Sequence, residues 1–107
     1  MKIIYVSGPI RSGLGWEGVF QNIMRARAAA RRLWRDGWAV ICPHMNTMFM
    51  DGPDLPDSMF LDGDREIIRR VDAIYMLPGW SSSIGANLEH DEAERIGIEI
   101  IYGEIVS

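Results

Sequence analysis

The sequence predicts a single-domain α/β protein with a doubly wound, Rossmann-like or flavodoxin-like parallel sheet of four to five strands and helices on both faces. Short runs of β-branched and aromatic residues alternate with longer segments in which apolar residues recur at helical spacing. The connections are short, which favours parallel strands joined by right-handed crossovers. The length of 107 residues suits one domain.

The first strand and the first helix are marked by a change of composition. Lys2–Val6 is β-branched and aromatic, and glycine and proline within 7–9 end the run. From Trp16 to Arg35 the composition turns to the helix formers alanine and arginine, with one leucine and one methionine, and Asp36-Gly37 follows as a stop signal. The apolar residues that recur at helical spacing are Phe20, Ile23, Ala30, Leu33 and Trp34. We therefore expect a long amphipathic helix.

A second strand and a long loop come next. Trp38–Cys42 is continuously apolar, as in a strand buried on both faces of a parallel sheet, and Pro43 breaks it. His44–Pro56 contains methionine, proline, glycine and aspartate without a steady period. This pattern predicts an irregular loop, of the kind that often covers a ligand.

A second helix and a third strand are predicted after this loop. Asp57 or Ser58 is expected to cap a helix that runs to Arg70. Asp72–Leu77 then has the composition of a strand, and Pro78 closes it.

The last third of the chain repeats the alternation. Residues 78–83 are typical of a turn, and a third helix is expected over Ile84–Ile96 with Gly97 as its stop. Ile98–Tyr102 is the fourth predicted strand.

Composition and charge exclude several classes of protein. The sequence is 48% hydrophobic and 24% charged, which argues against a disordered, collagen-like or coiled-coil chain. The formal charge is −4 and basic residues gather only at 25–35, so we expect no nucleic-acid partner, whereas a small phosphate ligand fits. No apolar run approaches the roughly 18 residues of a membrane span, so no membrane partner is expected. The single Cys42 and an opening segment unlike a signal peptide favour a reducing cytoplasm.

Three loops are the expected ligand sites, because ligands of open parallel sheets bind beyond the carboxyl ends of the strands. These loops are 7–15, 43–57 and 78–85. The third places three serines and Gly85 at a helix N-terminus, where free backbone N–H groups and the helix dipole favour a phosphate or carboxylate. In the alternative interpretation, one serine caps the helix and the others are solvated.

Two carboxylates interrupt the apolar faces of the predicted helices. Asp64 shares its face with Phe60, Leu61, Ile67, Ile68 and Val71, and Glu89 shares its face with Gly85, Ala86, Ala93 and Ile96. A carboxylate against apolar surface has to be paired, hydrogen-bonded, metal-bound or functional, and its pKa is usually raised. A single such acid is explained as a capping or edge residue. Two acids flanking one strand point instead to the paired carboxylates that cleave glycosidic bonds.

Other single residues carry less information. His44 follows the second strand and is placed to face a ligand, and Arg11 lies in the first loop, where a solvated surface arginine is the alternative. Neither Cys-x-x-Cys nor His-x-x-x-His spacing occurs, so we expect no metal site. The dinucleotide fingerprint and the phosphate loop ending in Gly-Lys-Ser/Thr are also missing, and no cofactor is expected.

Three segments together resemble the nucleoside 2-deoxyribosyltransferase superfamily over nearly the whole chain. They are residues 4–11 (Ile-Tyr-Val-Ser-Gly-Pro-Ile-Arg), residues 64–72 before the third strand, and residues 83–89 (Ser-Ile-Gly-Ala-Asn-Leu-Glu). Gly79-Trp80 and the run 85–90 look like the small branch found in bacteria and phages. The first and last segments are also similar to the 2′-deoxynucleoside 5′-phosphate N-hydrolases. The resemblance implies one nucleoside 2-deoxyribosyltransferase-like domain over residues 1–107.

The resemblance also implies a retaining mechanism, in which a glutamate attacks C1′ of the sugar and forms a glycosyl-enzyme ester. The motifs match Glu89 to this nucleophile, Asp64 to the acid that helps protonate the departing base, and Tyr5 to the residue that orients the nucleophile. Ser83, Gly85 and Arg11 match the residues used for a 5′-phosphate. The full set expected to bind substrate is Ser7, Gly8, Pro9, Ile10, Arg11, His44, Trp80, Ser83 and Gly85.

The expected function is therefore cleavage or transfer of the N-glycosidic bond of a nucleoside 5′-monophosphate or a nucleoside. Two alternatives stay open. One is a non-catalytic nucleotide-sensing module, and the other is a TIR-like NAD-cleaving enzyme, whose fold also places a glutamate beyond a parallel sheet.

A homodimer or a dimer of dimers is expected from the bulky side chains. Four tryptophans and seven methionines are more than such a small sheet and three helices readily cover. Met24 and Trp34 broaden the apolar stripe of the first helix beyond one sheet face. Residues near the 44–56 loop or the C-terminus are expected to reach the neighbour's pocket. In the alternative, these side chains fill the core of a monomer.

Overall fold

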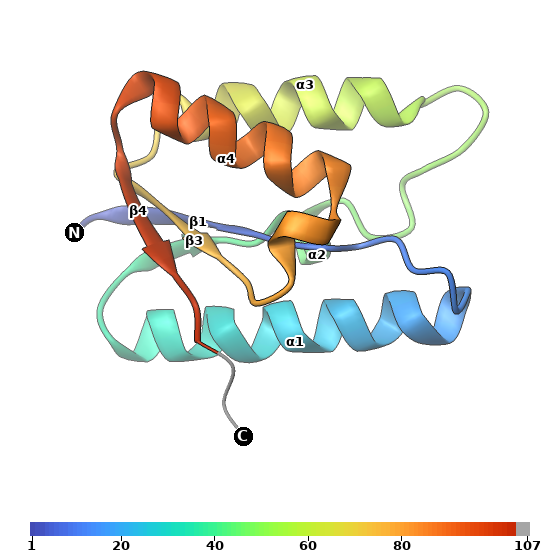
Figure 1. Ribbon diagram of the computed structural model, residues 1–107, viewed down its shortest axis with the longest axis horizontal. Helices are drawn as coiled ribbons and strands as arrows, with labels where there is room; N and C mark the ends of the chain where they lie inside the picture. The colour runs from blue at the N-terminus through green and yellow to red at the C-terminus, as the bar shows by residue number, and fades with distance from the viewer. Residues whose placement is uncertain (105–107) are drawn as a thin grey trace.

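The computed structural model describes residues 1–104 and confirms the predicted α/β fold (Figure 1). Its elements are β1 (Ile3–Ser7), α1 (Trp16–Arg35), β2 (Ala39–Ile41), α2 (Pro43–Asn46), α3 (Asp57–Ile68), β3 (Ala73–Met76), the short 3-10 helix η1 (Trp80–Ser82), α4 (Ile84–Ile96) and β4 (Glu99–Tyr102). The described strands form one parallel sheet in the order β2-β1-β3-β4. Helix α1 covers one face, and α3 and α4 cover the other (Figure 1).

The alternation of side chains along β1 divides the core into two layers. Ile4 and Val6 pack toward α1, together with the alanines of that helix. Tyr5 packs on the opposite face with residues of α3 and α4. Because side chains two residues apart share a face of a strand, Ser7 lies on the same side of the sheet as Tyr5. A polar pair of hydroxyls is thus turned toward α3 and α4.

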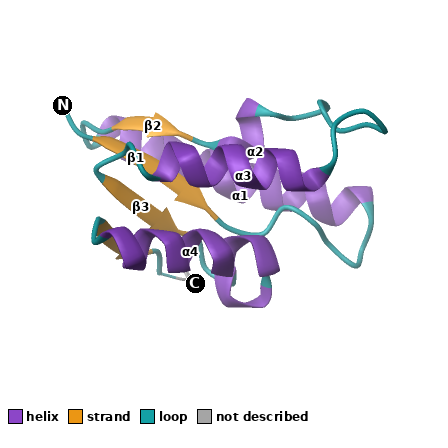
Figure 2. Cartoon of the chain, turned by 90° about the horizontal axis from the view of Figure 1, so that it is seen from above, coloured by secondary structure: helices purple, strands orange, loops and turns teal. Residues whose placement is uncertain are grey.

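Strand β1 lies inside the sheet, between β2 and β3 (Figure 2). Tyr5 is aligned with Ile41 on one side and Ile74 on the other, and Ser7 is aligned with Met76. Ile4, Tyr5 and Val6 have no exposed surface. Strands β1 and β3 are the two inner strands of the described sheet, so β1 is hydrogen-bonded along both edges and holds its side chains in place.

Two helices have the predicted bounds, and the loop between β2 and α3 differs from the prediction. Helices α1 and α4 begin and end where the sequence placed them, with Gly97 in the left-handed conformation (φ 79°) after α4. The loop predicted to be irregular over 44–56 begins with α2, which Pro43 starts at its first position. The cap predicted at Asp57 or Ser58 is wrong: Pro56 precedes α3, without a side-chain cap, and the Asp57 carboxylate pairs with Arg11.

The apolar side of α1 is narrower than predicted. Its buried residues are Gly18, Ile23, Ala26, Ala29, Ala30 and Leu33, whereas Phe20, predicted to face the sheet, is 52% exposed. Trp34, predicted to lie beyond one sheet face, is 56% exposed. A 20-residue helix is about 30 Å long, whereas the five-residue β1 spans about 17 Å. Parts of α1 therefore extend past the sheet and leave large side chains at the surface. Within residues 1–104, no helix is long and apolar enough to cross a membrane.

Candidate active site

A buried carboxylate lies where β1 meets α4. Glu89 is 7% exposed. The Tyr5 hydroxyl donates a hydrogen bond to its Oε2 at 2.5 Å, and the Ser7 hydroxyl donates to its Oε1 at 2.7 Å. Each carboxylate oxygen therefore has a fixed donor, and the group is held in one orientation by two residues of a central strand.

Small residues on α4 bring Glu89 this close to the sheet. Ala86 lies one turn before Glu89 and Ala93 lies one turn after it, and both are almost fully buried. Their methyl groups allow the helix to pack against β1 and β3 without a large side chain between them. The apolar face that the sequence predicted for Glu89 is thus the face that carries it onto Tyr5 and Ser7.

Asp64 approaches the same hydroxyl from α3. Its side chain is half-buried, and burial raises the pKa of its carboxyl to about 6, while the nearby Tyr5 hydroxyl acts in the opposite direction. Tyr5 is thereby placed between two acids. Burial, together with the two carboxylates, raises the pKa of Tyr5 far above its ordinary value, so it remains a protonated donor.

Burial also raises the pKa of Glu89, to about 7. The hydrogen bonds from Tyr5 and Ser7 favour the ionised carboxylate and lower this pKa, and the neighbouring Asp64 raises it. Two acids that both titrate near neutrality within electrostatic reach of each other behave as a coupled pair. Such a pair suits proton transfer at neutral pH, since one partner can hold a proton while the other is ionised.

In the loop of three serines before α4, one serine caps the helix, as one of the two interpretations of the sequence predicted. Ser83 caps α4, its Oγ accepting a hydrogen bond from the Ala86 N–H at 3.2 Å. The Asn87 side chain donates to the carbonyls of Ser81 and Ser83 at 3.0 and 2.8 Å, which ties the loop to the first turn. Gly85 lies in this turn. The loop is therefore rigidly attached to the helix that carries Glu89.

The loop after β1 is packed tightly at its start and open further on. Gly8 is buried, and a Cβ there would lie 2.6 Å from Cδ1 of Leu77, so only glycine fits. The His44 ring is buried and its Nε2 bonds the Pro9 carbonyl at 2.9 Å. Burial lowers the pKa of His44. This histidine, predicted to face a ligand, contacts the backbone of the loop and supports Pro9.

Ile10 and Arg11 complete this loop at the surface. Both carbonyls accept hydrogen bonds from the Asn22 side chain of α1, and the Arg11 guanidinium pairs with Asp57 at the start of α3. The side chains of Arg11 and Asp57 are mostly exposed. Arg11, predicted to bind phosphate, is therefore held at the first residue of α3.

Trp80 belongs to an aromatic cluster beside the site. Its indole stacks on the His90 ring, with centroids 4.4 Å apart and an angle of 18° between the planes. The His90 Nε2 is hydrogen-bonded to the Tyr102 hydroxyl at 2.7 Å, at the end of β4. One face of Trp80 is thus covered by the protein.

Several contacts at the site were outside the sequence prediction. Ser7 was expected to touch substrate, and the structure shows it bonded to Glu89. The position of Ser7 two residues after Tyr5, which places both side chains on one face of the strand, could have indicated this contact. No feature of the sequence indicated the hydrogen bonds from Asn87 to the loop of three serines or the ion pair between Arg69 and Glu92. In residues 1–104, no three histidine, cysteine, aspartate or glutamate side chains gather in a way that could hold a metal ion.

The raised pKa of Glu89 makes a testable prediction for stability. Because the folded protein keeps this proton at pH values where the unfolded chain has released it, the stabilisation is full below about pH 4.3 and is lost as the pH rises through about 7. Glu89→Gln should therefore raise the unfolding free energy at pH 8, by up to about 3 kcal/mol, and the gain should vanish near pH 4. Thermal unfolding of wild type, Glu89→Gln and the exposed control Glu94→Gln measures this. Equal stabilities at pH 8 would contradict it.

Two solved structures share the fold of this chain. One is a 2-deoxyribosyltransferase from Bacillus psychrosaccharolyticus, with a TM-score of 0.66 and 19% sequence identity. The alignment covers 98% of this chain and 77% of the Bacillus chain. A 2-deoxyribosyltransferase from Leishmania mexicana has a TM-score of 0.64 and 17% identity, with coverages of 95% and 63%. No curated protein matches the sequence. The fold is nucleoside 2-deoxyribosyltransferase-like. The family described as Domain of unknown function (DUF4406) matches residues 2–102, and the chain belongs to this family.

Proposed function

We propose that this protein cleaves or transfers the N-glycosidic bond of a nucleoside 5′-monophosphate or a nucleoside. The observation that carries the proposal is the buried Glu89 carboxylate, held by the hydroxyls of Tyr5 and Ser7 beside a second acid, Asp64. Paired carboxylates of this kind are the usual means of breaking a bond at an anomeric carbon. The shared fold of two 2-deoxyribosyltransferases supports the same class of chemistry.

In the proposed reaction, a carboxylate oxygen of Glu89 attacks C1′ of the sugar. The new C1′–O bond forms as the C1′–N bond breaks, and the electron pair of that bond leaves with the base, which takes a proton from Asp64. Water or an acceptor base then attacks C1′, loses its proton to Asp64 and releases Glu89. Tyr5 and Ser7 orient the nucleophile and stabilise its charge when it leaves again.

The proposed roles require a proton on Asp64 and a charge on Glu89 in the substrate complex. The hydroxyls of Tyr5 and Ser7 favour charge on Glu89. Burial opposes them, and it also raises the pKa of Asp64. A bound base favours the proton on Asp64 when its ring nitrogen accepts a hydrogen bond from the protonated acid, because that bond stabilises the acid form.

The proposed phosphate site combines the start of α4 with the first loop. The N–H groups of Ile84 and Gly85 lie in the first turn of α4, before the Ala86 N–H that Ser83 caps, and the helix dipole favours an anion there. Arg11 supplies a positive charge from its exposed pair with Asp57. Gly8, Pro9, Ile10 and Trp80 form the remaining walls proposed for the substrate, and His44 holds this loop from behind.

Loss of the nucleophile tests the proposed reaction directly. Glu89→Gln should lower base release by roughly 10³-fold or more, because the amide cannot form the ester. The exposed Glu94→Gln on the same helix should keep wild-type turnover. Chromatography of free bases after incubation with nucleosides, nucleoside monophosphates and NAD gives the measurement. Near-normal turnover by Glu89→Gln would overturn the proposal. Tight nucleotide binding by the wild-type protein without base release would also overturn it, and would indicate a nucleotide-sensing module.

The phosphate site has its own test. A nucleoside 5′-monophosphate should bind more tightly than its nucleoside, and Arg11→Gln should weaken binding of the monophosphate by roughly 1.5 to 3 kcal/mol while leaving the nucleoside unaffected. Calorimetry on both ligands measures the difference, and Arg35→Gln, exposed at the end of α1 away from this loop, is the matched control. Equal affinities of wild type for the two ligands would place the anion elsewhere.

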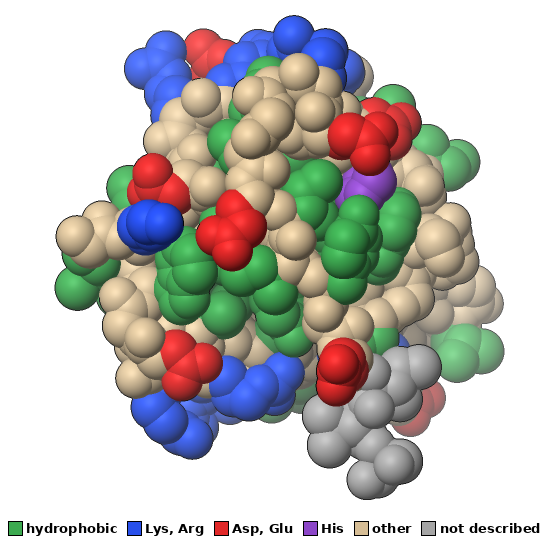
Figure 3. Space-filling view, turned by 60° about the vertical axis from the view of Figure 1, so that its left-hand side comes forward, with side chains coloured by type: hydrophobic (Ala, Val, Ile, Leu, Met, Phe, Trp, Pro, Cys, Tyr) green, Lys and Arg blue, Asp and Glu red, His purple; other side chains and the backbone are tan. Residues whose placement is uncertain are grey.

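We also propose that a second copy of the chain covers the large side chains left exposed on α1 and the following loop. Trp16, Phe20 and Trp34 are each more than half exposed, and Trp16 contacts the exposed Phe49 ring. Hydrophobic side chains also reach the surface in groups on the face shown in Figure 3. Such groups are typical of subunit interfaces. The predicted contribution of the C-terminus includes residues 105–107, which lie outside the described residues.

Light scattering coupled to size exclusion, at micromolar concentration, tests this assembly. A homodimer or a dimer of dimers is expected. Phe20→Lys should dissociate it, whereas Arg32→Glu, exposed on the flank of α1 away from Phe20 and Trp34, should leave the assembly intact. A wild-type mass equal to one chain would refute the assembly.

A further inference from the structure

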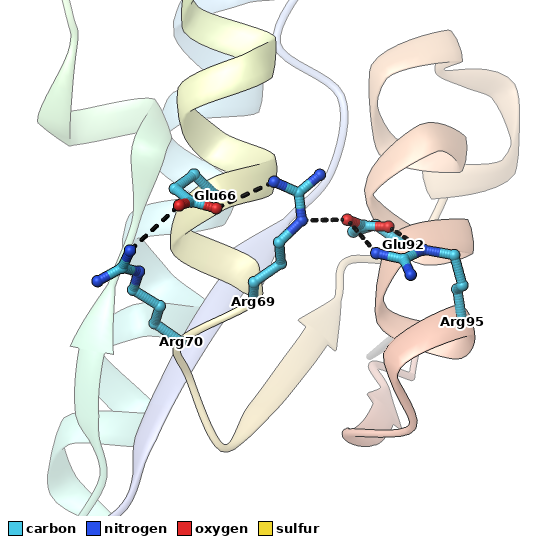
Figure 4. Close-up of polar contacts among 5 residues, drawn as sticks. All are labelled: Glu66, Arg69, Arg70, Glu92 and Arg95. Carbon is cyan, nitrogen blue, oxygen red and sulfur yellow. Dashed lines mark hydrogen bonds and ion pairs between the residues drawn. The ribbon is translucent and has the colours of Figure 1, made fainter.

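A second buried carboxylate lies outside the proposed site, between α3 and α4 (Figure 4). The Glu92 side chain is 3% exposed. It accepts a hydrogen bond from Nε of Arg69, at the end of α3, at 2.6 Å. It also accepts bonds from Nε and one terminal nitrogen of Arg95, on its own helix, at 2.8 and 2.9 Å. Arg69 further donates to Glu66 at 3.0 Å.

The Arg69–Glu92 pair joins the two helices that carry the two acids of the proposed site. Glu92 follows Glu89 by three residues, about 4.5 Å along α4, and Arg69 follows Asp64 by five residues, about 7.5 Å along the α3 direction. Among residues 1–104, this pair is the one side-chain hydrogen bond between α3, with its final cap, and α4. Apolar packing supplies the other contacts, with Ile68 and Ala93 fully buried.

We propose that Arg69 is a positioning residue, which through Glu92 sets the separation of α3 and α4 and thereby the separation of Asp64 and Glu89. Apolar contacts are non-directional and let two helices slide, whereas a short hydrogen bond to a buried carboxylate fixes a distance. We call the Arg69–Glu92 contact the clamp. The effect of the clamp on turnover rests on the function proposed above. Its effect on the geometry of the two acids does not.

The clamp keeps its charge over the range in which the two acids titrate. The hydrogen bonds from Arg95 and Arg69 lower the pKa of Glu92 to about 2. The groups that face Glu89 are Tyr5 and Ser7 from β1 and Asp64 from α3. If α3 moves away, water reaches both acids, and the pKa of Glu89 falls toward its ordinary value because burial is the main cause of its rise.

Arg95 provides a matched control for Arg69. Arg69→Gln removes the bond between the helices and leaves Glu92 paired with Arg95, so no uncompensated charge is buried. Arg95→Gln removes two hydrogen bonds but leaves the bond between the helices intact. Arg69→Gln also removes two hydrogen bonds, because Arg69 donates to Glu66 as well, so a role in stability alone predicts similar effects of the two variants. A positioning role predicts that Arg69→Gln has the larger effect.

Titration of the Glu89 carboxyl by carbon-13 NMR, in the substrate-free full chain, tests the proposal without turnover. Arg69→Gln should lower the midpoint by about one pH unit, Arg95→Gln should leave it at the wild-type value, and Arg69→Lys should restore part of the shift. In assays, Arg69→Gln should move the acid limb of the pH–rate profile the same way and lower kcat by roughly tenfold, with little change in KM.

Equal shifts in Arg69→Gln and Arg95→Gln, or no shift in either, would overturn the clamp. If Arg69→Gln does not fold, Glu92→Asp takes its place, since it keeps the charge and draws it away from Arg69; an unchanged Glu89 midpoint would then overturn the proposal. If the Glu89 midpoint shifts as expected but the protein releases no base from any nucleotide or nucleoside, the clamp is supported and the proposed function is rejected. If the protein releases base but Arg69→Gln leaves the Glu89 midpoint unchanged, the clamp alone is rejected.

Discussion

The hydrogen bonds from Tyr5 and Ser7 to Glu89 hold a carboxylate inside the layer between β1 and α4, where an ionised group is unfavourable unless it is bonded. Much of the fold serves this contact. A central strand supplies both hydroxyls, and the small residues of α4 let the helix approach them. The same burial that disfavours the charge brings the pKa of Glu89 into the neutral range, and the proposed glycosyl transfer would use this property.

The two buried carboxylates of α4 differ in the groups that they meet. Toward the sheet, Glu89 meets hydroxyls and a second acid, and its pKa is raised. Toward α3, Glu92 meets two guanidinium groups and its pKa is lowered. One helix therefore carries a carboxylate poised to change its protonation and, three residues later, one that stays charged. With the proposed clamp in place, Glu92 holds the framework in which Glu89 works.

The sequence predicted well whatever depends on periodicity and poorly whatever depends on contacts between distant elements. The bounds of α1 and α4 follow from apolar spacing and glycine stops, and the burial of Glu89 follows from its place on an apolar face. Four residues are too few to show a period, so α2 was missed. Neither the turn of Ser7 toward Glu89 nor the pairing of Arg69 with a residue 23 positions away is encoded in local spacing.

The proposed function depends above all on a covalent bond between Glu89 and the sugar, and peptide mass spectrometry of acid-quenched protein tests for this bond most directly. The substrate should be a nucleoside 5′-monophosphate with fluorine at C2′, because fluorine there destabilises positive charge on the sugar and slows hydrolysis of the ester. We expect one sugar-phosphate adduct per active chain, located on Glu89. An adduct on another residue, or base release with no adduct on Glu89, would contradict the proposed mechanism.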